Sequence, residues 1–134
     1  MSKFTVIFCD DIREERGNKK SLMGVVSGDV LAASFPATLQ IALFIEYEPD
    51  ASHRDAGQGD SLKVEFRLMQ DDTEIAKGNM LAKFPLGRAV NFVLPKGLVS
   101  FEKPATFRVL VSVDGGAEEE ILSKKILPAP GPIS

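Results

Sequence analysis

The chain alternates between short apolar runs and polar, turn-forming clusters. The clearest pattern covers residues 62–69, in which Leu62, Val64, Phe66 and Leu68 alternate with Lys63, Glu65, Arg67 and Met69. A period of two places the first set on one face of a β-strand and mainly charge on the other. A helix would spread these charges around its circumference. The pattern therefore predicts a half-buried strand.

A second alternating run covers residues 106–113, where Phe107, Val109, Val111 and Val113 share one face. Asp114-Gly115-Gly116 follows this run and predicts a short hairpin loop, because glycine reaches positive φ at little cost. The last predicted strand covers residues 119–127.

Further apolar runs complete the predicted set of elements. Strands are expected over residues 4–9, 39–47 and 89–94, the last ended by Pro95-Lys96-Gly97, and a return strand begins at 74–77 after a tight turn at 70–73. The charged residues 11–19 predict a helical turn or a solvated loop, with Gly17-Asn18 turning the chain into 21–27. Residues 49–61 contain mainly turn formers and predict a long exposed loop.

Roughly seven to nine short strands without a helix favour an all-β fold. We expect a two-sheet antiparallel β-sandwich, immunoglobulin-like or C2-like and arranged as a meander, because a single sheet could not bury so many alternating strands. A closed β-barrel is the alternative. The sandwich is expected to be one domain, residues 1–127. Residues 128–134 form a proline-rich tail that we expect to be disordered.

Composition narrows the possible partners. The 134 residues carry 16 basic and 19 acidic side chains, a net charge of -3. The basic residues are scattered, so we expect no nucleic-acid partner, because phosphate backbones favour locally dense Lys and Arg. The apolar run near the N-terminus is too short for a secretory signal, and no run could span a membrane. With a single cysteine, the expected location is the cytoplasm.

The acidic segment after the first strand is the main candidate for a metal site. Asp10, Asp11, Glu14 and Glu15 could supply hard oxygen ligands, but calcium needs about six to eight converging oxygens. The other interpretation is a charged edge that prevents aggregation. We expect no metal and no cofactor, and keep Asp10, Asp11 and Glu14 as weak candidates. The aspartates elsewhere, among them Asp71, Asp72 and Asp114, are interpreted as turn formers.

Cys9 and His53 are the one thiol and the one imidazole of the chain. A thiol nucleophile needs a base within hydrogen-bond reach, and nothing in the sequence places these two residues together. Cys9 ends an apolar strand and is expected to be a small buried hydrophobic residue. No catalytic residue is predicted, and a zinc site of the usual type is close to excluded.

A family resemblance rests on two runs near the N-terminus. The runs are Phe8-Cys9-Asp10-Asp11-Ile12-Arg13-Glu14-Glu15 and Lys20-Ser21-Leu22-Met23-Gly24-Val25-Val26. They resemble an uncharacterised family of small bacterial and phage all-β proteins, a domain of unknown function. The resemblance implies a fold and a bacterial or viral source, and no activity.

The absence of a catalytic motif favours a non-enzymatic protein-interaction or structural module. The loops at 49–61 and 84–88 are the candidate surfaces, and the apolar residues 22–26 and 39–45 would allow a homodimer. The alternative is a calcium-type metal-dependent binding module, or a small hydrolase, that uses Asp10 and Asp11.

Overall fold

The computed structural model describes residues 3–17, 19–48, 61–83 and 90–130. These residues form ten strands in chain order, more than the seven to nine expected from the sequence. The strands are β1 (Lys3–Cys9), β2 (Asp11–Glu15), β3 (Lys19–Met23), β4 (Val30–Ala32), β5 (Ala37–Glu48), β6 (Ser61–Gln70), β7 (Thr73–Lys83), β8 (Val90–Phe101), β9 (Ala105–Val113) and β10 (Glu119–Pro128). Among the described residues, no helix is long and apolar enough to cross a membrane.

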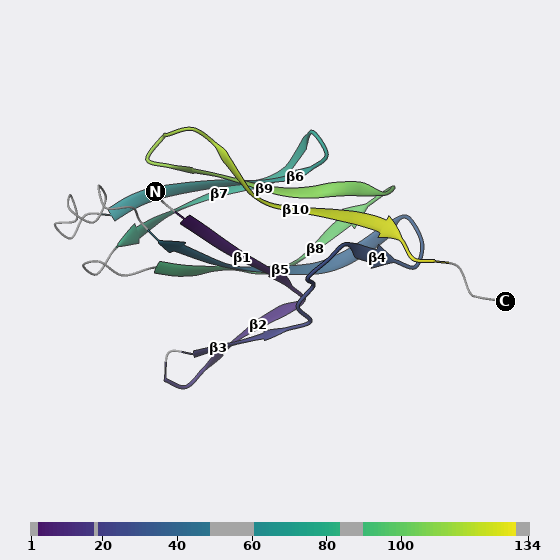
Figure 1. Cartoon of the computed structure of the whole chain (residues 1–134), viewed down its shortest axis with the longest axis horizontal. Coiled ribbons are helices and arrows are strands. Elements are labelled where there is room, and N and C mark those ends of the chain that lie inside the picture. Colours follow the sequence, from purple (N-terminus) through teal and green to yellow (C-terminus); the bar gives the residue numbers. More distant parts are fainter. Residues whose placement is uncertain (1–2, 18, 49–60, 84–89, 131–134) are drawn as a thin grey trace.

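Two sheets form the body of the molecule. One has three strands in the order β1-β5-β8, and the other has five in the order β4-β10-β9-β6-β7. The sheets lie face to face, and the hairpin β2–β3 extends away from the smaller sheet (Figure 1). The strands pair antiparallel except for β4, which runs parallel to β10. The predicted all-β sandwich is confirmed, and the barrel alternative is wrong, because neither sheet closes on itself.

The core lies between the sheets, where the alternating faces predicted from the sequence meet. Val64 of β6 and Val109 of β9 are fully buried, as are Ile45 and Tyr47 of β5. The ring of Phe107 packs edge-on against Phe8 and Phe101, with centroids 5.8 and 6.5 Å apart. These contacts join β9 to both β1 and β8. The predicted strands at 62–69 and 106–113 therefore supply the core, with the difference that Met69, assigned to the charged face of its strand, is also buried and only 6% exposed.

The order of the strands differs from the expected meander. The chain changes sheet from β4 to β5, from β5 to β6, from β7 to β8 and from β8 to β9, and β9 lies between β6 and β10. Alternation defines which face of a strand is buried, but it carries no information on which strand lies beside it. The predicted loops at 49–61 and 84–88 fall almost entirely outside the described residues, with Ser61 already in β6.

Two local predictions are wrong. Residues 11–15 form strand β2 instead of a helical turn or loop, because Glu14 and Arg13 pair across the hairpin with Lys20 and Ser21. Only Asp11 and Ile12, at the start of this strand, are half-buried, and the other three residues are exposed, so no apolar alternation reveals it. Strand β8 runs through Pro95 instead of ending there. It is an edge strand, and its pairing with β5 shifts register at this point, where Pro95 and Lys96 together lie opposite Ala42.

The end of the chain is ordered further than expected. Pro128 still pairs with Ala32 of β4, and the N–H of Ala129 donates to the carbonyl oxygen of Ala32 at 2.7 Å. Regular structure therefore continues past residue 127, and residues 131–134 lie outside the described part.

Candidate functional site

The acidic candidates from the sequence have separate surroundings. One oxygen of the Asp11 carboxylate accepts a hydrogen bond from the Ile12 N–H at 2.8 Å, and the other lies 3.9 Å from Arg13 Nε. Glu14 Oε2 lies 3.6 Å from Lys20 Nζ. The described residues contain no group of three or more His, Cys, Asp or Glu side chains that could hold a metal ion. The structure therefore does not bring Asp10, Asp11 and Glu14 together as one ligand set.

Two of the turn aspartates have the backbone role expected of them. Asp71 and Asp114 have φ values of 52° and 51°, in the left-handed region that aspartate tolerates better than most residues. The Asp71 carboxylate accepts a hydrogen bond from the Thr106 N–H at 2.9 Å. Their interpretation as turn formers is confirmed.

Cys9 is completely buried at the end of β1, as expected for a small hydrophobic residue. Its Sγ lies 3.6 Å from the carbonyl oxygens of both Asp11 and Ala42. Burial, followed by the nearby charge of Asp10, raises the pKa of this thiol above its usual value of 9.0. The thiol is therefore protonated at neutral pH. His53 lies outside the described residues, so its separation from Cys9 stays a prediction.

The chain bends sharply at Asp10, between β1 and β2. The N–H of Asp10 donates to the carbonyl oxygen of Met23 at 2.9 Å, and the Val26 N–H donates to that of Phe8 at 3.0 Å. These bonds close the base of the hairpin. Gly24 has a φ of +68°, and a Cβ at this position would overlap the Asp10 carboxylate. The bend thus requires glycine for two independent reasons.

A hollow of about 370 Å³ lies beside this bend. Its apolar lining residues are Phe8, Val26, Val30 and Leu39, and its polar lining residues are Asp10, Thr38 and Gln40. Gln40 Nε2 donates to the carbonyl oxygen of Asp10 at 2.9 Å, which joins β5 to the bend. The hollow therefore combines an apolar surface with one carboxylate, one amide and one hydroxyl.

The hollow lies at the point where the pairing between β1 and β5 ends. Strand β1 pairs with β5 from Glu48 to Ala42, and the bend at Asp10 then directs the chain away. Residues 37–41 of β5 pair with β8 on the other side but have no strand partner on the β1 side within the described chain. Backbone donors and acceptors on an unpaired edge are available to another extended segment.

One cation holds the loop that lines the hollow. Lys124 Nζ, from β10, donates to the carbonyl oxygens of Val26 and Gly28, both at 3.0 Å. The Asp10 carboxylate itself has neither a hydrogen bond nor an ion pair with any described residue. Within the described part of the chain, the hollow thus contains a carboxylate without a counterion, and the ammonium group of Lys124 is engaged by backbone oxygens.

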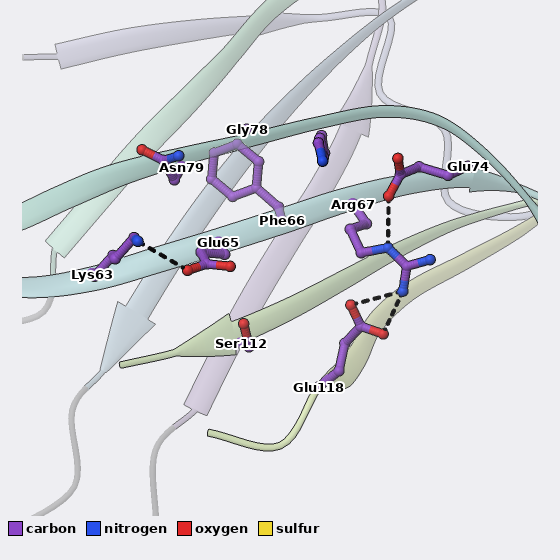
Figure 2. A pocket seen from close by; sticks show the side chains of 10 residues that line it. Lys63, Glu65, Phe66, Arg67, Glu74, Gly78, Asn79, Ser112 and Glu118 are labelled. Atoms are coloured by element: carbon purple, nitrogen blue, oxygen red, sulfur yellow. Dashed lines mark hydrogen bonds and ion pairs between the residues drawn. The ribbon is translucent and has the colours of Figure 1, made fainter. Parts of the chain in front are cut away.

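A second hollow, of about 470 Å³, lies on the outer face of the five-stranded sheet. Figure 2 shows Arg67 there between two carboxylates, with Nε 2.8 Å from Glu74 and Nη1 2.8 Å from Glu118. Hydrogen bonds to Glu74 and then Glu118 raise the pKa of Arg67. Lys63 pairs with Glu65 at 3.3 Å. Because most charges here are already paired and exposed, this surface is a weaker binding candidate than the hollow at the bend.

The sequence indicated Asp10 but missed its neighbours in the hollow. Thr38 and Gln40 are polar residues at the start of the most apolar strand, and they alternate with Leu39 and Ile41. That alternation was a usable signal that β5 is exposed on one face at this end. Val30 and Lys124 gave no comparable signal, because they reach the site only through tertiary structure.

Fold and site together define a small all-β sandwich domain with a polar-rimmed hollow beside the bend that follows its first strand. The chain belongs to DUF6941, a family of unknown function, whose model matches residues 5–122. The match includes Asp10, Gly24 and the whole lining of the hollow. Comparisons with curated proteins and with solved structures gave no match. Membership of an uncharacterised family, expected from the N-terminal runs, is thus confirmed.

Proposed function

We propose that this protein is a non-enzymatic binding module that holds a segment of another polypeptide in the hollow at the bend. The observation that carries this proposal is the unpaired β1 side of β5 at residues 37–41, which borders an apolar hollow. Sheet edges bind extended peptides through main-chain hydrogen bonds, and adjacent pockets select their side chains.

The chemistry of the lining favours binding over catalysis. Among the polar residues of the hollow, the Thr38 hydroxyl lies 3.2 Å from the Ser100 hydroxyl, and the Gln40 amide donates to Asp10. Neither thiol nor imidazole lines the hollow, so no side chain there could act as the base for a hydroxyl nucleophile except a carboxylate. Half-buried Val26, Val30 and Leu39 instead offer apolar surface that a bound segment would cover.

The apolar surfaces proposed from the sequence differ in how much of them is exposed to a partner. The apolar residues of 39–45 are largely used in the core, with Ile41, Leu43 and Ile45 all at most 6% exposed. Met23 and Val25, in contrast, are 42% and 54% exposed next to the bend and could extend the contact with a partner. The bacterial or phage source and the cytoplasmic location stay predictions from the sequence.

A display selection with random heptapeptides tests this proposal. Bound peptides would be ranked by calorimetry against the wild-type protein and two variants. Gln40→Arg places a long side chain at the hollow and beside Asp10, and should abolish binding. Leu98→Arg is the matched control, because Leu98 lies directly opposite Gln40 on β8 and is 73% exposed.

The expected result is a set of heptapeptides that bind the wild type and Leu98→Arg equally and do not bind Gln40→Arg. Circular dichroism and thermal melts of all three proteins establish that each is folded. If no peptide is selected, or if Gln40→Arg binds as well as Leu98→Arg, the hollow is not a polypeptide-binding site.

A further inference from the structure

We infer that the bound segment is an extended strand with a lysine or arginine whose cationic group pairs with Asp10. This inference rests on the proposed function and adds the chemistry of the partner. Three observations support it: the carboxylate has no partner among the described residues, its surroundings are apolar, and the edge of β5 at residues 37–41 has no strand partner in the same part of the chain.

Asp10 is held in place before any ligand arrives. Its N–H donates to Met23, its carbonyl oxygen accepts from Gln40 Nε2, and its carboxylate lies against Gly24. A group fixed in this way loses little conformational freedom on binding, which favours affinity. The two hydrogen bonds hold the N–H and the carbonyl oxygen of Asp10 itself, while its carboxylate stays exposed.

The charges around the hollow favour a cation. Lys124 is the basic side chain attached to the lining loop, and its ammonium group donates to two carbonyl oxygens of that loop. Arg13 lies beside Asp11 instead of Asp10. A cationic partner group would therefore meet an uncompensated carboxylate.

The apolar lining selects the kind of cation. Lys and Arg bury their aliphatic stems on apolar surface while the charged head stays at a polar rim. Phe8, Val26 and Val30 provide such a surface next to Asp10. A small inorganic cation would leave this surface uncovered, whereas a basic side chain covers it and reaches the carboxylate.

The unpaired edge determines the conformation of the segment. An extended strand along residues 37–41 of β5 would continue the sheet at the place where β1 leaves it. Alternate side chains of such a strand point to the same face, so one basic residue can enter the hollow while residues two positions away lie over its rim.

The same random heptapeptide selection, repeated with Asp10→Asn, tests the inference. Asparagine has nearly the shape of aspartate, so the contact with Gly24 is kept and the charge is removed. The wild type should enrich Lys or Arg at one position of the peptide, and Asp10→Asn should lose that enrichment. Asp29→Asn, which removes a charge from the same loop without altering the lining, should keep it.

A double-mutant cycle makes the pairing quantitative. Replacement of the enriched arginine by citrulline, its uncharged analogue, should weaken binding to the wild type about tenfold or more, since charge-assisted hydrogen bonds are the strong ones. The same replacement should change binding to Asp10→Asn less than about twofold if the two groups interact directly. N-methylation of backbone amides in the peptide should weaken binding at alternate positions only, because one edge of a strand faces β5.

The outcomes separate the inference from the proposed function. Heptapeptides that are sensitive to Gln40→Arg but show no Lys or Arg preference, or an equal citrulline effect in both proteins, would overturn the inference and leave the binding function intact. Binding that tolerates N-methylation at every position would overturn the extended conformation. Failure to select any heptapeptide sensitive to Gln40→Arg would overturn both.

Discussion

The carboxylate of Asp114 accepts a hydrogen bond from the N–H of Lys63 at 2.8 Å, and the N–H of Asp114 donates to the carbonyl oxygen of Lys63 at 2.8 Å. Asp71 makes the same reciprocal pair of bonds with Thr106. The two aspartates follow β9 and β6, and their partners lie near the starts of β6 and β9. The β6–β9 pair is therefore closed at both ends by the same arrangement.

This arrangement predicts a ranking of substitutions at Asp114. Asp114→Ala should lower the free energy of unfolding by about 1–2 kcal/mol, because it removes the side-chain acceptor and places alanine at positive φ. Asp114→Asn should cost less, since asparagine keeps an acceptor oxygen and tolerates that conformation. Urea denaturation of both variants measures the difference.

Asp72 provides the control for this series. It is exposed in the turn between β6 and β7 and does not have a positive φ. Asp72→Ala should change the free energy of unfolding by less than about 0.5 kcal/mol. If Asp114→Ala and Asp114→Asn lower the free energy of unfolding equally, then neither the side-chain hydrogen bond nor the positive φ explains how Asp114 stabilises the fold.

The contact between Gly24 and Asp10 predicts a coupled effect. Gly24→Ala should destabilise the fold by more than about 2 kcal/mol, through positive φ and through overlap with the carboxylate. Gly17 has a φ of +77° but open space around it, so Gly17→Ala should cost about 1 kcal/mol from φ alone. Thermal and urea melts of both variants separate the two causes.

Removal of the Asp10 side chain completes this test. Asp10→Ala should partly restore the stability of Gly24→Ala and should leave the effect of Gly17→Ala unchanged, because contacting residues couple and separated ones add. If the changes in the free energy of unfolding caused by Asp10→Ala and Gly24→Ala simply add in the double variant, the contact between the two residues does not explain the cost of Gly24→Ala.

Burial of Cys9 predicts a dependence of stability on pH. Its pKa is raised in the folded protein, so the unfolded chain releases the thiol proton at lower pH than the folded one. The contribution of the protonated Cys9 thiol to the free energy of unfolding is complete below pH 9.0. It is lost as the pH rises from there through the raised pKa of the folded state. The free energy of unfolding should thus fall more steeply above pH 9.0 in the wild type than in Cys9→Ala.

The same thiol gives a direct chemical readout. Because the thiolate is the reactive form and the side chain is buried, an aromatic disulfide reagent at neutral pH should label Cys9 slowly in the native protein and rapidly in urea. Rapid labelling of the native protein, or parallel pH profiles for the wild type and Cys9→Ala, would contradict this account.

Local periodicity made much of the fold predictable. Val64 and Phe66 in β6, and Val109 and Val111 in β9, occupy the inward positions that alternation assigned to them, because the strand period of two is a property of the backbone itself. Glycine and aspartate likewise marked the turn at Asp114. Strand β2 was missed because most of its residues are exposed and its two half-buried residues, Asp11 and Ile12, are adjacent in the chain, so burial left no alternation.

The sequence alone therefore determined the class of fold, the inward faces of the long strands, the buried role of Cys9 and the turn role of Asp71 and Asp114. Tertiary structure decided the strand order, the separation of the acidic side chains, and the hollow in which Asp10 meets Thr38 and Gln40. The physical reason is the range of each interaction. Alternation and turn conformation are local, whereas the hollow depends on where β1 stops pairing with β5, a register that connects residues more than thirty positions apart.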